Sequence, residues 1–390
     1  MTEAFITPSV VNWARRRIHL TVDEAAQKLH IEPEVLAAWE SGSLRPDMSQ
    51  AEDLAQKLHI PFGYLFLSNP PTEPVPLPDL RTIGDKPPAT LSPEFQELIY
   101  DVIAKQEWYK EYQEEEEATP IGFVGSFAGN DDVETIAADI RRTLGLTQAM
   151  RQSASDWEDF LRKFIAKTEG VGVLVLRAGY VGRDTHRTLD EREFRGFVIS
   201  DPLAPLIFLN GRDAKAAQIF TLAHELAHVW RGQTGISDPD YRQSSDGSNS
   251  SERICNEIAA EVLIPKTDFV VAWTSTETIP ENVRRLARRY RVSNIVVLRK
   301  ALDTNTITRS EFQQYYDAIA LSGPSKSEKG GGNYYNTLIA RNSVSLTSRI
   351  LSALAQGRTT YREASRLLDV KMTMLNSLPT KLFGGGTSIG

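Results

Sequence analysis

The run FTLAHELAHVW, residues 220–230, places two histidines and a glutamate in an H-E-x-x-H pattern on a segment with helical spacing. Four residues advance an α-helix by slightly more than one turn, so the rings of His224 and His228 leave the same face and can bind one metal ion. Glu225 follows the first histidine, close enough to exchange a proton with a water molecule at that ion. The pattern is typical of zinc hydrolases and predicts a metal-binding helix.

The residues around the motif are apolar on almost every side of the helix, as Leu222, Leu226 and Trp230 illustrate. A helix of this kind belongs in a core. Two imidazoles and a carboxylate without partners would be costly to bury there, and a metal ion satisfies all three. The alternative, a pair that is solvated or only hydrogen-bonded, is disfavoured by these apolar flanks.

Catalytic zinc takes three protein ligands and one water, so a third ligand is expected. None of the six histidines follows His228, which excludes a third histidine downstream. The helical stretch SERICNEIAAEVLIP, residues 251–265, is the natural source. There we predict Glu252 as the third ligand. We also predict Asn256, one turn later, as the group that holds a zinc-bound imidazole by its other nitrogen.

Glu257 and Glu261 on the same stretch are alternative ligands, although each is by default an ordinary helical carboxylate. The single cysteine, Cys255, is by default a small buried apolar residue. A further donor to the developing oxyanion is expected, and His186 and Tyr241 are its candidates, with a structural or surface role as the alternative for each. The cofactor predicted by these residues is one Zn²⁺ per chain, with Glu225 as the general base of a hydrolysis.

Short apolar runs precede the motif and predict a small sheet. They are residues 172–176, 197–200 and 206–210, each rich in β-branched or aromatic residues and bounded by Gly, Pro or Asp. An edge strand of such a sheet could hold an extended peptide by strand addition. The stretch between the two metal helices, GQTGISDPDYRQSSDGSNS, has no periodicity and predicts a mobile loop. The fold class is therefore α+β, in a mainly helical multidomain chain.

The two motifs together, TLAHELAH and then ExxCNEIAAEVLIP about two dozen residues later, resemble the ImmA/IrrE metallopeptidases. The resemblance is strongest over residues 170–266 and implies a gluzincin-like core in which His224, His228 and Glu252 are the ligands and Glu225 is the base. It also implies cleavage of a transcriptional repressor, itself a helix-turn-helix protein. Asn256 stands where related gluzincins often carry Asp, and an amide is a weaker acceptor.

The first 67 residues predict a separate all-α domain of short helices joined by tight turns. Apolar periodicity marks the helices, Thr21 and Glu24 form a capping box, and Pro33 stands at a helix start. The run LTVDEAAQKLHIEPEVLAAWESGSLRP resembles the XRE-type helix-turn-helix, in which the third helix enters the major groove. The resemblance therefore implies an N-terminal helix-turn-helix domain fused to the metallopeptidase core.

The charges of this domain do not favour DNA. Residues 1–70 contain six Lys or Arg and nine Asp or Glu, a net charge of −3, and the presumed groove-facing positions include Glu32 and Glu34. Phosphate binding needs the opposite sign. The candidate contacts with DNA or a protein partner are the basic residues Arg15, Arg16, Arg17, Arg284, Arg285, Arg288 and Arg289, with a solvated basic face as the alternative.

Composition shifts predict the domain boundaries. Eight prolines between residues 68 and 93 favour an extended connector, and three glycines at 330–332 indicate a flexible break. The predicted parts are a helix-turn-helix domain at 1–67, a Pro-rich linker at 68–93, a helical segment at 94–168, the metallopeptidase core at 169–270, a helical, helix-turn-helix-like segment at 271–321, a flexible linker at 322–333, and a C-terminal helical segment at 334–390 with a disordered tail.

The whole chain has 390 residues, one cysteine and a net charge of −7. A lone cysteine excludes a disulfide framework, and no signal peptide or long apolar run occurs, so we expect a cytoplasmic protein without a membrane partner. No feature sets an oligomeric state. Two function classes remain.

The first class is a zinc endopeptidase that cleaves a transcriptional repressor or antitoxin in stress, phage or mobile-element regulation. The second is a DNA- or protein-binding regulator, in a toxin-antitoxin or phage-defence pair, with a non-catalytic metallopeptidase fold. The intact Glu225 favours the enzyme, because a binder without activity has no need of that carboxylate.

Overall fold

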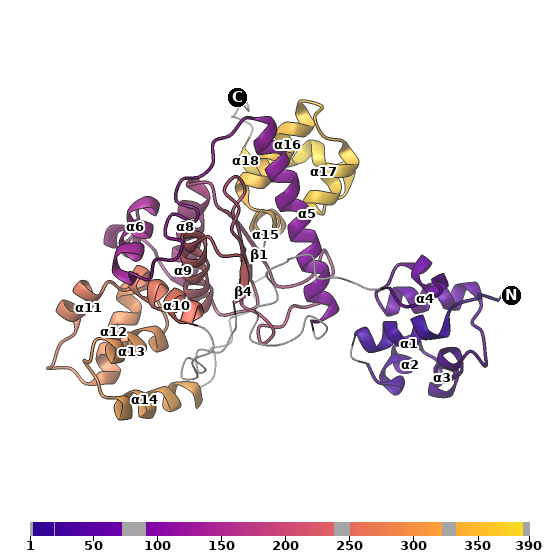
Figure 1. Cartoon of the computed structure of the whole chain (residues 1–390), viewed down its shortest axis with the longest axis horizontal. Coiled ribbons are helices and arrows are strands. Elements are labelled where there is room, and N and C mark those ends of the chain that lie inside the picture. Colours follow the sequence, from indigo (N-terminus) through magenta and orange to yellow (C-terminus); the bar gives the residue numbers. More distant parts are fainter. Residues whose placement is uncertain (1–2, 19, 72–90, 238–249, 322–332, 385–390) are drawn as a thin grey trace. The chain divides into compact units, whose positions relative to one another are not determined.

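The computed structural model describes residues 3–18, 20–71, 91–237, 250–321 and 333–384. They form two compact units (Figure 1). The first holds the N-terminal helices, and the second holds most of the helix that begins at Pro93 together with the later helices and strands. Three kinds of predicted segment lie mostly outside the described residues. They are the linkers at 68–93 and 322–333, the mobile loop at 232–250, and the disordered tail.

Amphipathic helices with strong caps build the first unit. They are α1 (Pro8–Arg17), α2 (Val22–Leu29), α3 (Pro33–Ser41), α4 (Met48–Lys57) and the 3-10 helix η1 (Phe62–Phe66). The capping box predicted at Thr21 and Glu24 is present, because each residue's side chain accepts the other's backbone N–H. Leu36 and Trp39 of α3 pack in the core of this unit. The predicted helices are confirmed.

A mixed four-stranded sheet lies at the centre of the second unit, with the strand order β1-β3-β2-β4. The strands are β1 (Leu174–Ala178), β2 (Gly196–Ile199), β3 (Leu206–Asn210) and β4 (Gly235–Ser237). β3 pairs parallel with β1 and antiparallel with β2, and β2 pairs antiparallel with β4. The strands predicted from the apolar runs are present within one or two residues, and β4 was not predicted.

Helices cover both faces of the sheet. α8 (Trp157–Gly170) and α9 (Lys215–Arg231) lie on one side, and α5 (Pro93–Glu115) lies on the other (Figure 1). Val198 of β2 and Ile207 of β3 face the α9 side and share its core. This arrangement confirms the α+β class and explains why β2 and β3 are buried at every position.

The core on the α9 side extends well beyond the metal-motif helix. It also contains residues of α6 (Val133–Leu144), α10 (Ser250–Leu263), α11 (Lys266–Ala272), α12 (Ile279–Tyr290) and α13 (Asn294–Asp303), from Ile136 to Ile307. The short α7 (Gln148–Gln152) and α14 (Arg309–Leu321) complete this region. Boundaries predicted at 168/169 and 270/271 therefore do not separate cores here, because composition changes there while the apolar faces still pack together.

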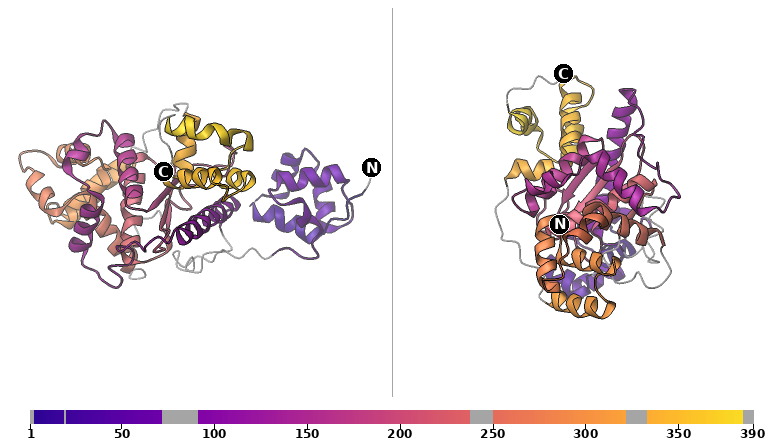
Figure 2. Two further views of the ribbon diagram at one scale, coloured as in Figure 1. Left: turned by 90° about the horizontal axis from the view of Figure 1, so that it is seen from above. Right: turned by 90° about the vertical axis from the view of Figure 1, so that its left-hand side faces the viewer.

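The C-terminal helices pack on the same unit beside α5, as Figure 2 shows in yellow. They are α15 (Tyr334–Asn342), α16 (Val344–Ala355), α17 (Tyr361–Leu368), the 3-10 helix η4 (Met372–Ser377) and α18 (Leu378–Phe383). Arg341 of α15 donates to the carbonyl of Gly182. Arg358 pairs with Glu115, the last residue of α5, and with Glu116, which follows it. Within the predicted C-terminal helical segment, α15 and α16 are separated at Ser343, whose φ is 64°.

Among the described residues, no helix is both long enough and apolar enough to cross a membrane.

Candidate metal centre

The H-E-x-x-H residues lie in the most buried part of α9. His224, Glu225 and His228 are 4%, 0% and 5% exposed, in a helix that is buried from Gln218 to Arg231. Gly232 ends the helix in the left-handed conformation, with φ at 68°. The burial predicted from the apolar flanks is confirmed, and the motif is part of the core.

The first turn of α10 brings a carboxylate to the two histidines. Glu252 Oε2 lies 3.2 Å from His224 Nε2, Glu252 Oε1 lies 3.3 Å from His228 Nε2, and the two Nε2 atoms are 3.0 Å apart. The three side chains form the one group of potential metal ligands found among the described residues, with ligand atoms within 4.8 Å of one another. Two consecutive helices thus present three ligand atoms to one point.

These spacings fit a tetrahedral zinc site. Zinc bonds to imidazole nitrogen and carboxylate oxygen of about 2.0–2.1 Å give a tetrahedron with edges of about 3.3 Å. The observed separations of 3.0, 3.2 and 3.3 Å come close to that value before any ion is considered. The donor set, two imidazoles and one carboxylate, is also one that catalytic zinc uses, and it leaves the fourth position for water.

The site also favours an ionised carboxylate. Burial alone would raise the pKa of Glu252, but hydrogen bonds from His224 and His228 outweigh it and hold that pKa well below its usual range. Burial likewise would lower the pKa of His228, and its contacts with Cys255 and Glu252 raise that pKa instead. Glu252 is therefore anionic at neutral pH, as a metal ligand must be.

The two alternative ligands lie elsewhere on α10. Glu257 is exposed, and one of its carboxylate oxygens lies 3.9 Å from Arg253. Glu261 is buried, where it pairs with Lys300 of α13 and accepts the backbone N–H of Lys266 at 2.9 Å. Neither carboxylate shares the point where the histidines meet Glu252, because α10 turns each to a different side.

The outer nitrogen of His228 has a partner that the sequence pattern did not predict. His228 Nδ1 lies 3.2 Å from Oε1 of Gln233, just beyond the end of α9, and 3.6 Å from Cys255 Sγ. Asn256, predicted for this role, is partly exposed and makes no hydrogen bond with either histidine in the described part of the chain. The helix-ending Gly232 was the signal that could have pointed to Gln233.

Glu225 lies against the sheet, beneath β2. A Cβ atom added to Gly196 would be 2.6 Å from Thr221 Cγ2, 2.9 Å from the carbonyl oxygen of Phe208 and 3.0 Å from Glu225 Oε1. The missing side chain at Gly196 therefore leaves the space that the carboxylate of Glu225 and the side chain of Thr221 use. This approach was not predicted from the sequence.

His186, one of the two predicted oxyanion donors, is exposed in the loop after β1, where its backbone N–H donates to Asp184 Oδ1 at 2.9 Å. Tyr241 lies outside the described residues.

The candidate DNA contacts of the first unit divide into internal and exposed residues. Arg15 is buried, with its Nε 2.5 Å from Glu40 and its Nη1 donating to the carbonyl of Leu20 at 2.8 Å. Arg17 is half-buried beside the ring of Trp13, and Arg16 is exposed. Arg15 is therefore a structural residue that ties α1 to α3.

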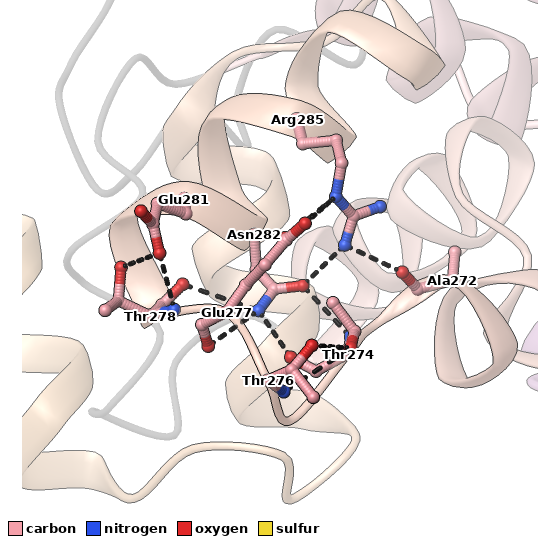
Figure 3. Close-up of polar contacts among 8 residues, drawn as sticks. All are labelled: Ala272, Thr274, Thr276, Glu277, Thr278, Glu281, Asn282 and Arg285. Carbon is pink, nitrogen blue, oxygen red and sulfur yellow. Dashed lines mark hydrogen bonds and ion pairs between the residues drawn. The ribbon is translucent and has the colours of Figure 1, made fainter.

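The four candidate contacts on α12, namely Arg284, Arg285, Arg288 and Arg289, form a second basic cluster. They also include one internal residue and several exposed ones. Figure 3 shows Arg285 turned toward the loop before α12, where it donates to Glu277, Asn282 and the carbonyl of Ala272. Asn282 is fully buried and binds the same loop, donating to the carbonyl of Thr274 at 2.8 Å. Arg285 thus holds a turn together.

Arg284, Arg288 and Arg289 are exposed on α12, and the last lies near the ring of Tyr290. They are the members of this cluster that remain available to a partner.

Comparison with known protein families finds one match within each unit. Residues 168–302 match the IrrE N-terminal-like domain, and residues 11–65 match the helix-turn-helix family. The first match spans β1 to α13, so it contains α9, α10 and every residue at the candidate metal point. Searches of curated proteins and of solved structures found no match. The chain therefore joins an N-terminal helix-turn-helix domain to an IrrE N-terminal-like domain with a metallopeptidase-like fold.

Proposed function

We propose that this chain is a zinc-dependent endopeptidase that cleaves a protein substrate in the cytoplasm, a transcriptional repressor or antitoxin. The observation that carries the proposal is the convergence of His224, His228 and Glu252 at tetrahedral spacing, with Glu225 in the same helix. A regulator that only binds its partners has no need for this set of side chains in its core.

The residues of the site have two different roles in peptide hydrolysis, metal binding and proton transfer. His224, His228 and Glu252 would hold one zinc ion. When bound, zinc supplies a Lewis acid that polarises the scissile carbonyl and makes water more acidic. Glu225 takes the proton of the attacking water and returns it to the leaving amine. Burial of Glu225 beneath β2 fixes this carboxylate in place, which lowers the cost of orienting it.

The sheet offers a place for an extended substrate. β1 ends the sheet on one side and β4 on the other, and β4 begins two residues after Gln233. A peptide added beside β4 would lie next to the segment that leaves the metal helix. Strand addition fixes the backbone of a substrate without demanding a particular side chain.

We assign the first unit to docking of a protein partner. Arg15 is neutralised by Glu40, and the exposed positions of α3 include Glu34 and Ala37, which neither attract phosphate nor read base edges. DNA remains the competing partner because the unit has a helix-turn-helix fold. The residues that could contact DNA are the exposed arginines, which are Arg16 in the first unit and Arg284, Arg288 and Arg289 in the second.

The test compares new protein N-termini in cells that express the wild type or Glu225→Gln at equal levels. Glu225→Gln keeps the shape and the metal ligands but removes the base. We expect at least one new N-terminus, within a regulatory protein, that is present with the wild type and absent with the variant. New N-termini that appear equally with both proteins would contradict the endopeptidase proposal.

A further inference from the structure

The end of the metal-motif helix folds back over one of its own histidines. Gly232 donates its N–H to the carbonyl of Val229 at 3.1 Å, and Gln233 donates to the carbonyl of His228 at 2.9 Å. This pair of bonds is a Schellman motif, in which a left-handed residue returns the next residue to the last turn of the helix. Gln233 therefore lies over His228 because of how the helix ends.

The side chain of Gln233 uses this position. Its Oε1 lies 3.2 Å from His228 Nδ1, the nitrogen on the other side of the ring from the Nε2 that faces Glu252. Ser251, next to Glu252 in the first turn of α10, donates its hydroxyl to the same oxygen at 2.9 Å. One amide oxygen thus connects the end of α9 with the start of α10.

We propose that Gln233 is a positioning residue, which accepts the Nδ1 hydrogen of His228 and so directs the lone pair of its Nε2 toward the metal point. This inference rests on the proposed zinc site. An imidazole that binds a metal ion is neutral and carries one N–H, so an acceptor at Nδ1 leaves Nε2 without hydrogen when the ion is bound. An uncharged amide here differs from the carboxylate that often holds a zinc-bound histidine.

The Nδ1 atoms of the two histidines have different surroundings. His224 Nδ1 is buried and has no hydrogen-bond partner among the described residues. Among the described residues, only His228 therefore has side-chain partners at its outer nitrogen, Gln233 Oε1 at 3.2 Å and Cys255 Sγ at 3.6 Å. The amide oxygen is the stronger hydrogen-bond acceptor of the two. Replacing Gln233 should change how tightly the site retains its ion.

The experiment measures zinc affinity of the full chain by chelator competition for the wild type, Gln233→Met, Gln233→Glu and Asn256→Leu. We expect Gln233→Met to bind zinc about 10–100-fold more weakly, because it has similar length but no strong acceptor. Gln233→Glu keeps an acceptor and should bind at least as tightly as the wild type. Asn256→Leu should bind like the wild type.

The absorption spectrum of the Co²⁺-loaded protein separates positioning from general stability. It should shift in Gln233→Met while the melting temperature of the metal-free protein stays at the wild-type value. If Gln233→Met proves unstable, Ser251→Ala replaces it, and a smaller loss of affinity is expected because only the second donor is removed.

Three results would overturn the inference. Wild-type affinity in Gln233→Met would show that the amide does not hold the ring. Equal weakening in Gln233→Met and Gln233→Glu would show that the amide donates instead of accepting. Weakening in Asn256→Leu alone would assign the role to Asn256. If the wild type itself bound no zinc, the proposed function would fail together with this inference, and that outcome is distinct from the other three.

Discussion

At the scale of single residues, glycines with opposite surroundings stand on two adjacent strands. Gly196 of β2 lies against Thr221 and Glu225, and a Cβ atom added there would be 2.6 Å from Thr221 Cγ2 and 3.0 Å from Glu225 Oε1. Gly235 of β4 has nothing within 4 Å of the same position. The two residues also lie near each other in the sheet, because Val198 of β2 pairs with Gly235. The pair can therefore separate the effect of crowding at the general base from the effect of a side chain in the sheet.

We predict that Gly196→Ala destabilises the protein by about 1–3 kcal/mol, the usual cost of overfilling a packed core. Neither the carbonyl of Phe208 nor the helix behind Thr221 can move away freely. Gly235→Ala should stay within about 0.5 kcal/mol of the wild type, because its new methyl group meets open space. Denaturant unfolding measures both, and equal effects would show that Gly196 is not crowded as described.

At the scale of elements, α10 carries one carboxylate near each end, and the two have different partners. Glu252 in the first turn faces the histidines, and Glu261 near the last turn pairs with Lys300 of α13. Both members of the second pair are less than 10% exposed at the side chain. Arg141 and Arg151 donate to the carbonyls of Glu261 and Val262, so the carboxyl end of α10 is held by cations.

We predict that Glu261→Gln destabilises the protein by about 3–5 kcal/mol, because it leaves the buried charge of Lys300 without its partner. The double variant Glu261→Met with Lys300→Met should recover most of that loss, since no buried charge remains. Glu257→Gln on the same helix is the control, and its exposed pair should contribute about 0–1 kcal/mol. Urea unfolding compares them; a Glu261→Gln variant as stable as Glu257→Gln would contradict the buried pair.

Elements also differ in how far a sequence reveals them. The helices of the first unit, α9 and α10 follow from apolar spacing and caps, which are local properties. The ligand atoms of His224, His228 and Glu252 come together, as their spacing on two helices suggested. Gln233 could not be found from spacing, because its role depends on the turn after Gly232. Arg15 and Arg285 could not be distinguished from exposed arginines, because their partners lie in other elements.

At the scale of the whole molecule, the boundaries expected from the sequence do not coincide with boundaries between hydrophobic cores. Residues 94–168, 169–270 and 271–321 were expected as separate parts, yet one core contains residues from Ile136 to Ile307. The IrrE N-terminal-like match, residues 168–302, likewise runs across the expected boundary at 270. Sequence periodicity reveals that a helix has an apolar face, but the choice among possible partners is made only in the folded chain.

The most direct test of the proposed zinc site is the metal content of purified, metal-repleted protein, measured by elemental analysis. We predict about one zinc per chain in the wild type and in Glu225→Gln, because Glu225 is not a proposed ligand. Glu252→Ala should lose most of the zinc, and Glu257→Ala, on the same helix, should keep it. A wild type without zinc, or a Glu252→Ala variant that retains it fully, would contradict the claim that these three side chains form the metal site.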